Sequence, residues 1–278
     1  MKVVIITGAA SGIGLALSLA HLQKGLKVIM VDINAEQLKK QTDQLNCDFP
    51  NRVTGFVCDV TKHEETDLLA QQIRTLSTAI YCIYNNAGII GTLAPVWELT
   101  SEQISQVIEV NLYGMTNMIR SFIPLLFQQN IQSRIINMAS LYALCSGSQM
   151  SAYAMSKHAV LALSESLYFD LKRLEKPVDV SVVFPSFTDT ALLNKDSTDD
   201  SSEFHNTLRS LLAHSRPAVD VAANIMQEVE QNRFYILPDK EVKGYCEDRA
   251  RSIILQEIPH VNNVEKLVSS LMQRKKAR

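Results

Sequence analysis

The sequence predicts a single-domain α/β fold in which a doubly wound, parallel, seven-stranded sheet carries helices on both faces. Short apolar runs alternate with helical patterns along the chain, and parallel strands need such crossover helices. The first apolar run also ends in a glycine-rich turn that leads into a helix. With 278 residues, 46% of them hydrophobic, and no repeat or low-complexity linker, the chain can bury one large core.

Each expected strand is a short apolar run that ends at turn residues, which is typical of buried parallel strands. The strands are expected near residues 3–7, 27–32, 52–57, 79–85, 132–139, 178–184 and 233–237. Two of the intervening helices, 101–129 and 153–174, carry more apolar positions than one sheet-facing stripe requires. This surplus predicts that both helices also contact a partner chain.

The first strand runs into Thr7-Gly8-Ala9-Ala10-Ser11-Gly12-Ile13-Gly14, and a helix begins at about Gly12. Unpaired backbone N–H groups and the positive end of the helix dipole meet there, and glycines let a pyrophosphate approach the backbone. The next apolar run ends at Asp32, about twenty residues further on, where a carboxylate can bind both ribose hydroxyls. The pattern predicts a dinucleotide site; alternatively, the glycines only cap a strand and Asp32 only caps a helix.

A second cluster of polar residues predicts proton transfer. Tyr153 and Lys157 are four residues apart and share a helix face, and Ser140 lies thirteen residues before Tyr153. A phenol has a pKa near ~10, which an ammonium group within a few ångströms lowers by roughly 1–3 units. We therefore expect Lys157 to lower the pKa of Tyr153 so that the phenol exchanges protons near neutral pH. The same spacing also occurs by chance on solvated helices.

Charge and cysteine content exclude several classes of protein. The net charge of −2 gives no indication of nucleic-acid binding. The cysteines are odd in number and scattered, with no metal-site spacing, so no metal is expected, and we expect buried thiols of a reducing compartment: Cys47, Cys58, Cys82, Cys145 and Cys246. The first strand starts too early to leave room for a signal peptide, and no apolar stretch reaches transmembrane length, which predicts a cytoplasmic protein.

These motifs resemble those of the short-chain dehydrogenase/reductase (SDR) family over about the first 240 residues. The glycine turn is similar to the family's T-G-x-x-x-G-x-G, Asn85-Asn86-Ala87-Gly88 to its N-N-A-G turn, and Cys58-Asp59-Val60 to the segment after its third strand. Asn111 lies where the family has a catalytic asparagine. The resemblance implies a Rossmann-type catalytic domain at 1–238, a C-terminal helical extension at 239–278, and a homodimer or homotetramer.

The resemblance also implies the residues of the site. The catalytic residues would be Ser140, Tyr153, Lys157 and Asn111. The cofactor would contact Thr7, Gly8, Ser11, Gly12, Ile13, Gly14, Asp32, Ile33, Asp59, Val60, Asn86, Ala87, Gly88, Tyr153, Lys157, Pro185, Thr188 and Thr190. Tyr153 would be the general acid/base, Ser140 would hold the substrate oxygen, and Asn111 would hold a water that links Lys157 to solvent.

The predicted cofactor is NAD(H). A 2′-phosphate would lie beside Asp32, and two negative groups a few ångströms apart repel unless a cation intervenes. Ser11, Ile33 and Asn34 occupy positions where NADP-preferring relatives commonly carry arginine or lysine.

Residues 186–216 are expected to form a substrate lid, because a polar, acidic stretch lies between apolar flanks. The flanks are expected to be pocket walls: Phe187, Leu192, Leu193, Phe204, Leu208, Leu211 and Leu212, completed by Leu141, Tyr142, Leu144 and Met150. Pro185-Ser186 departs from the family's Pro-Gly, so either the turn differs or Ser186 tolerates a glycine conformation. These walls predict a largely apolar alcohol or ketone as the substrate.

The sequence therefore predicts an NAD(H)-dependent oxidoreductase that interconverts a secondary alcohol and a ketone of lipid, steroid or acyl type. One alternative is a 3-oxoacyl-thioester reductase, which Asp32 disfavours because biosynthetic reduction normally uses NADPH. Another is a non-catalytic NAD(H)-binding sensor or scaffold on the same fold. The C-terminal helix, with apolar Val264, Leu267, Val268, Leu271 and Met272 and a basic end, either covers its own subunit or contacts a membrane surface weakly.

Overall fold

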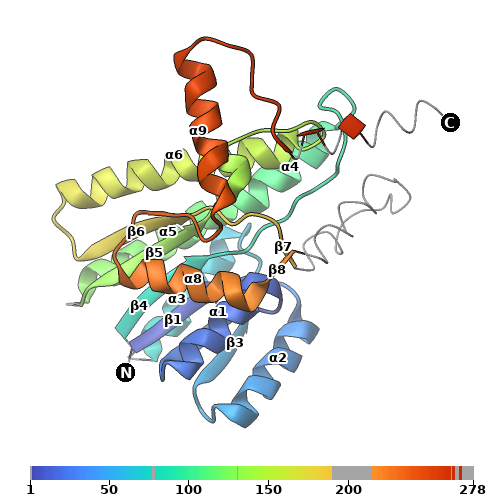
Figure 1. The fold of residues 1–278 in the computed structure, drawn as a ribbon. Helices are drawn as coiled ribbons and strands as arrows, with labels where there is room; N and C mark the ends of the chain where they lie inside the picture. Colours follow the sequence, from blue (N-terminus) through green and yellow to red (C-terminus); the bar gives the residue numbers. More distant parts are fainter. Residues whose placement is uncertain are drawn as a thin grey trace.

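The fold is taken from a computed structural model that describes residues 2–76, 79–129, 131–189, 215–263, 265–266 and 269–270. The strands of its main sheet are β1 (Lys2–Thr7), β2 (Lys27–Asp32), β3 (Val53–Val57), β4 (Ala79–Asn85), β5 (Ser133–Met138), β6 (Val178–Val183) and β9 (Tyr235–Ile236). They pair in parallel in the order β3-β2-β1-β4-β5-β6-β9 (Figure 1). This order confirms the predicted doubly wound sheet and puts its switch point between β1 and β4.

Helices cover both faces of the sheet (Figure 1). One face carries α1 (Gly12–Gln23), α2 (Ala35–Asp48) and α8 (Ala218–Glu230), and the other carries α3 (His63–Thr75), α5 (Gly114–Gln128) and α6 (Ser151–Arg173). Side chains alternate along β1, so Val4 and Ile6 pack in the first core while Val3 and Ile5 pack in the second. The remaining helices are α4 (Ser101–Ile108), α9 (Glu241–Ile254) and the short 3₁₀ turn η2 (Leu141–Ala143).

The predicted continuous helix at 101–129 is wrong in one respect. It consists of α4, a π-helical turn η1 (Glu109–Tyr113) and α5. A π turn accommodates one extra residue per turn, and such turns frequently occur at functional sites. Here the turn carries the fully buried Asn111.

Two shorter elements also differ from the prediction. The last strand of the sheet is only Tyr235–Ile236, because just two residues of the run pair with β6. In addition, β7 (Thr188–Asp189) and β8 (Arg216–Pro217) form a small parallel pair that the apolar pattern did not predict. This pair joins the two ends of the expected lid, whose central residues lie outside the described part of the chain.

The cysteines are all free, but only three of them are buried, so the expectation of five buried thiols is wrong for Cys47 and Cys246. Burial raises the pKa of Cys58, Cys82 and Cys145 to about 12. Since the thiolate is the reactive form, these three side chains behave as small apolar residues. Among the described residues, no helix has the length and apolar character needed to cross a membrane.

Candidate active site

The glycine turn brings β1, α1 and the turn after β4 close together. Gly8 has a φ of +63°, and a Cβ at this position would lie 3.0 Å from the Cα of Ala87. A Cβ at Gly14 would lie 2.3 Å from the carbonyl oxygen of Gly8, closer than any side chain permits. Gly12, with a φ of +54°, begins α1 and lines a cavity of about 410 Å³ together with Gly8, Ser11 and Ile13. The free N–H groups of the first helical turn therefore lie beside this cavity.

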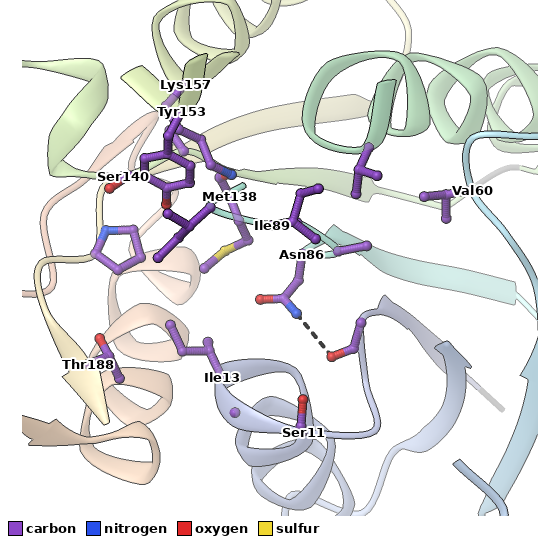
Figure 2. Close-up of a pocket in the computed structure, with 18 of the residues that line it drawn as sticks. Ser11, Ile13, Val60, Asn86, Ile89, Met138, Ser140, Tyr153, Lys157 and Thr188 are labelled. Atoms are coloured by element: carbon purple, nitrogen blue, oxygen red, sulfur yellow. Dashed lines mark hydrogen bonds between the residues drawn. The ribbon is translucent and has the colours of Figure 1, made fainter. Parts of the chain in front are cut away.

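Thr7 and Asn86 hold this turn in place. The hydroxyl oxygen of Thr7 accepts hydrogen bonds from the backbone N–H groups of Asn86 (2.9 Å) and Ala87 (3.0 Å). The side-chain amide of Asn86 donates to the carbonyl oxygens of Thr7 (2.9 Å) and Gly8 (3.3 Å; Figure 2). Asn86, Ala87 and Gly88 line the cavity, whereas Thr7 and Gly14 do not. In this structure Thr7 and Gly14 support the residues that form the cavity, and their predicted contacts with a cofactor stay predictions.

Carboxylates lie at the end of the cavity formed by β2 and β3. Asp32 is 6% exposed and accepts hydrogen bonds from the N–H groups of Ala10 (2.9 Å) and Asn34 (3.0 Å), which fixes its orientation. One oxygen of Asp59 accepts from the N–H and the hydroxyl of Thr61, at 2.9 and 2.8 Å. Asp32, Ile33, Asp59 and Val60 all line the cavity. Among the described residues that line it, Lys157 is the only cation.

Ser140, Tyr153 and Lys157 converge at another part of the same cavity. Figure 2 shows these three side chains together, with Ser11 and Ile13 across the cavity and Asn86 and Ile89 between. The Lys157 Nζ lies 5.6 Å from the centre of the Tyr153 ring and donates a hydrogen bond of 2.9 Å to the carbonyl oxygen of Met138. Tyr153 and Lys157 therefore share one face of α6, as predicted, and both line the cavity.

The pKa of Tyr153 differs from the prediction in its direction. Burial raises the pKa of the Tyr153 phenol above its usual value, while a hydrogen bond with Ser140 acts in the opposite direction and is the smaller effect. Burial also lowers the pKa of Lys157 to about 8. The expectation of a lowered Tyr153 pKa is therefore wrong for this structure, because desolvation of both side chains outweighs the effect of their spacing.

Asn111 supports the site from behind the cavity wall. Its Oδ1 accepts a hydrogen bond from the Ile89 N–H (2.8 Å), and its Nδ2 donates to the Ile89 carbonyl (2.9 Å) and the Ser156 hydroxyl (2.9 Å). A Cβ at Gly88 would lie 3.1 Å from Asn111 Oδ1 and 3.5 Å from Lys157 Nζ. Asn111 does not line the cavity. Its hydrogen bonds with Ile89 fix the turn between β4 and α4, and the distances from Gly88 place it near Lys157.

Pro185, Ser186, Phe187 and Thr188 form the wall that follows β6. The φ of Ser186 is not positive, and its N–H donates a hydrogen bond of 2.8 Å to the buried carboxylate of Asp239. Asp239 also pairs with Arg216. The sequence left open whether the turn differs from the family's or Ser186 adopts a glycine conformation; the turn differs. Thr190 lies outside the described residues.

Several lining residues were not predicted as site residues. They are mostly apolar and follow strand ends or motif residues: Val31, Cys58, Ile89, Ile90, Gln106, Val110, Met138 and Ala139. Their position directly beside the recognised motifs, as in Ile89-Ile90 after the Asn-Asn-Ala-Gly turn, was the available signal. Of the expected pocket walls, Leu141, Tyr142, Met150 and Phe187 line the cavity, whereas Leu144 does not. The other expected walls, Leu192, Leu193, Phe204, Leu208, Leu211 and Leu212, lie outside the described residues.

A phenol, a hydroxyl and an ammonium group in one cavity can hold an oxygen atom and exchange a proton with it. Comparison with known proteins shows the family to which the chain belongs. The family model for short chain dehydrogenases matches residues 2–201. The chain is 30% identical to the CLA biosynthesis dehydrogenase/reductase of Lactiplantibacillus plantarum, over 94% of this chain and 96% of that protein. It is 31% identical to 1-deoxy-11-beta-hydroxypentalenate dehydrogenase of Streptomyces exfoliatus, over 89% and 86% of the two chains.

A solved structure of similar fold is a short-chain dehydrogenase/reductase from Burkholderia phymatum in complex with NAD. It superposes with a TM-score of 0.87 and 28% identity, over 93% of this chain and 96% of that one. The chain is therefore a member of the short-chain dehydrogenase/reductase family, an oxidoreductase that acts on CH–OH donors with a nicotinamide cofactor.

Proposed function

We propose that the protein interconverts a secondary alcohol and a ketone on a largely apolar substrate of lipid, steroid or acyl type, with NAD(H) as the cofactor. The observation that carries the proposal is the convergence of Ser140, Tyr153 and Lys157 in a cavity that also contains the glycine turn and Asp32. A proton donor and a dinucleotide cradle in one cavity are what hydride transfer to a carbonyl requires.

The residues of the cavity fit a nicotinamide dinucleotide. Gly8 and Gly12 line the cavity at the N-terminus of α1, where a pyrophosphate would bind, and Gly14 lets α1 pack closely against Gly8 and Asn86. Asp32 would hold the adenosine ribose, and Asp59 and Val60 would contact the adenine. Tyr153 and Lys157 would bind the nicotinamide ribose, with Pro185 to Thr188 along the nicotinamide. The bound cofactor supplies or accepts a hydride.

Charge favours NAD over NADP. Asp32 is buried and its orientation is fixed, and the described lining residues offer no cation except Lys157, which belongs to the Tyr153 cluster. At about 4 Å and an effective dielectric constant of about 20, two unit charges repel by about 4 kcal/mol. A 2′-phosphate beside Asp32 would meet this repulsion without compensation.

Side chains of α6 and of the turn after β5 carry out the proton transfer. In carbonyl reduction, the Tyr153 hydroxyl gives its proton to the substrate oxygen while the carbonyl carbon receives the hydride; in oxidation, the phenolate takes the proton back. The Ser140 hydroxyl donates a hydrogen bond to the same oxygen and stabilises its developing charge. Lys157 stabilises the phenolate when it forms, and Asn111 fixes the turn that contacts Lys157.

The apolar wall supports an apolar substrate. Ile90, Val110, Leu141, Met150 and Phe187 line the same cavity as the catalytic cluster. Burying such a surface against a substrate contributes roughly 25 cal/mol per Å² of apolar area. Two relatives carry the names of dehydrogenases for hydroxylated compounds, hydroxypentalenate in Streptomyces exfoliatus and retinol in Rattus norvegicus.

The experiment measures NADH binding by fluorescence, followed by NAD⁺ reduction across secondary alcohols from short chains to steroids and 3-hydroxyacyl thioesters. Tyr153→Phe should lower kcat by about 10²–10⁴ because it removes the transferable proton, while NADH still binds through the glycine turn, Asp32 and Lys157. Tyr168→Phe, on the partly exposed face of the same helix, is the matched control and should leave turnover unchanged.

Other outcomes would favour the alternatives. NADH binding by the wild-type protein without turnover of any alcohol would favour the sensor or scaffold. Turnover confined to thioesters with NADPH would favour the 3-oxoacyl-thioester reductase. Tyr153→Phe activity within a few-fold of the wild type would contradict the role of Tyr153.

A further inference from the structure

The segment between Ser140 and Tyr153 forms one wall of the cavity. Its residues Leu141, Tyr142 and Met150 line the cavity beside the catalytic cluster. The Tyr142 ring packs edge-on against the Tyr153 ring, with centroids 5.9 Å apart and an interplanar angle of 72°. The position of this segment therefore determines how much space a substrate has next to the reactive phenol.

The wall between Ser140 and Tyr153 contains little regular secondary structure of its own. Only the short 3₁₀ turn η2 lies between β5 and α6. Near its end, Gln149 adopts a φ of +62°, a conformation that non-glycine residues rarely take and that persists only where the surroundings impose it. The wall thus needs support from another part of the chain.

That support comes from the segment after α9, more than one hundred residues further along the chain. The carboxylate of Glu265 accepts hydrogen bonds from the Ser148 N–H (2.7 Å) and the Ser148 hydroxyl (3.1 Å). The side-chain amide of Asn262 donates to the Ser146 carbonyl (3.1 Å), while its oxygen accepts from the Glu265 N–H (2.9 Å). Asn262 is 7% exposed, whereas Ser148 and its hydrogen bonds to Glu265 lie at the surface. We call the contacts of Asn262 and Glu265 with Ser146 and Ser148 the joint.

Gly147 lies between the two bonded serines and is close to both Glu265 and Tyr142. A Cβ at Gly147 would lie 3.4 Å from Glu265 Oε2 and 3.5 Å from the Tyr142 hydroxyl. Both distances start from the same point, so the carboxylate and the cavity-lining ring lie close together beside this glycine. A shift of Glu265 is transmitted to Tyr142 through a single residue.

Helix α9 holds the other end of the wall. Arg249 donates a hydrogen bond of 3.3 Å to the carbonyl oxygen of Ala143 in η2 and also contacts His158 Nε2. His158 is anchored through Nδ1 to the Ala154 carbonyl of α6, at 2.8 Å. After α9 the chain turns back on itself (Figure 1) and reaches Asn262 and Glu265. The C-terminal extension thus contacts both ends of the wall.

We propose that Asn262 and Glu265 are positioning residues that set the width of the substrate cavity and hence the substrate range. By fixing Ser146 and Ser148, they hold Tyr142 and Met150 against the reactive face of Tyr153. The inference rests on the proposed function, because it assigns this part of the cavity to the substrate. In the described part of the chain, the hydrogen bonds from Asn262 and Glu265 to the wall go to Ser146 and Ser148 and not to the glycine turn or Asp32 at the cofactor end.

The test compares Glu265→Ala with Glu265→Gln and with Glu257→Gln, an exposed glutamate of the same segment as a control. Each variant is assayed for KM and kcat with a small and a bulky secondary alcohol and for NADH affinity. Hydrogen exchange of residues 141–150 is measured in parallel. Loss of a hydrogen bond to a charged group corresponds to about a tenfold change or more.

Glu265→Ala should raise KM for the bulky alcohol about tenfold, leave NADH affinity and kcat for the small alcohol within about twofold, and accelerate exchange at Ser148. Glu265→Gln keeps an acceptor oxygen and should restore most of the wild-type KM. Glu257→Gln should match the wild type throughout. Asn262→Ala gives an independent second variant with the same expected pattern if Glu265→Ala folds poorly.

Unchanged KM and unchanged exchange at Ser148 in Glu265→Ala would overturn the inference. Equal losses for both alcohols together with weaker NADH binding would also overturn it, since they indicate a general loss of structure. A wild-type protein that turns over no alcohol defeats the proposed function instead. In that case hydrogen exchange in Glu265→Ala still decides whether the joint holds the wall.

Discussion

At the scale of single residues, burial determines the chemistry of the catalytic pair. The pKa of Tyr153 is raised and that of Lys157 is lowered to about 8, so at neutral pH the tyrosine is a protonated acid. In this state Tyr153 is ready to donate to a carbonyl oxygen, whereas alcohol oxidation requires the phenolate.

This arrangement predicts opposite pH dependences for the two directions. Between about pH 6 and pH 10, kcat/KM for alcohol oxidation should rise, by up to about tenfold per unit, because the phenolate fraction grows below the pKa of Tyr153. Carbonyl reduction should not rise with pH and should fall at the alkaline end as the acid is lost. The measured midpoints belong to the coupled Tyr153–Lys157 pair. A flat or falling oxidation profile would contradict the assignment.

Asp32 gives a second prediction at this scale. The double variant Asp32→Ala, Ile33→Arg should shift the ratio of kcat/KM from NAD toward NADP, because it removes the negative charge and adds a cation at an exposed position. It should also lower the free energy of unfolding by about 1–3 kcal/mol, since the N–H groups of Ala10 and Asn34 lose their acceptor. Ile33→Arg alone is the control for the added charge. An unchanged cofactor ratio in the double variant would refute the selection of NAD by Asp32.

The sequence predicted which residues line the cavity wherever their spacing alone brings them together. Ser140, Tyr153, Lys157 and Asp32 line one cavity because they follow strand ends or share a helix face. The direction of the Tyr153 pKa was not predictable, because spacing along a helix does not show how deeply the helix is buried. For the same reason, the sequence did not separate Thr7 and Gly14, which support the turn, from Gly8 and Gly12, which line the cavity.

At the scale of elements, the π turn η1 is the main departure from the predicted secondary structure. Apolar periodicity shows a helix over 101–129 but does not show one residue inserted within it. The inserted turn directs Asn111 at the backbone of Ile89, so that the helix holds the turn after β4.

Asn111→Ala should therefore affect both stability and activity. It leaves the N–H and carbonyl groups of Ile89 without their partner and should lower the free energy of unfolding by about 1–3 kcal/mol, with reduced kcat. Chemical denaturation and steady-state kinetics measure the two effects. Asn46→Ala, which removes a single hydrogen bond to the Val53 carbonyl, is the control and should cost less. Full stability in Asn111→Ala would show that η1 does not depend on this side chain.

The turn after β6 shows how an element can differ from its family pattern and still fit. Ser186 replaces the usual glycine, yet its backbone is not in the left-handed region, and Asp239 accepts its N–H. Asp239 comes more than fifty residues later in the chain, so no local pattern could reveal this partner.

At the scale of the whole molecule, the sheet was the most predictable feature. Strands alternate with helices, and this alternation determines the parallel pairing and the helical cover on both faces. The contacts of the C-terminal extension with the wall after Ser140 were not predictable, because they join distant segments through side chains such as Glu265. The interpretations of the C-terminal helix as a subunit cover or a weak membrane contact rest on residues outside the described part and stay predictions.

The exposed apolar side chains of α6 favour self-association. Met155 and Phe169 on α6, and Leu174 directly after it, are 46%, 66% and 55% exposed, which supports the proposal of a homodimer or homotetramer through this helix. Phe169→Asp should lower the mass measured by light scattering toward that of a monomer, because it puts a charge into an apolar interface. Val219→Asp, on α8 at the opposite face of the sheet, is the control. Dissociation by Val219→Asp and not by Phe169→Asp would locate the interface on the other face.

The unequal exposure of the cysteines has a practical consequence. Cys47 on α2 and Cys246 on α9 are exposed, while the other three thiols are buried with raised pKa values. Thiol-directed dyes should therefore attach at only these two positions, without any substitution in the chain. One dye would then lie on α2 and the other on α9, so energy transfer between them would report any displacement of α9 as a substrate enters or leaves.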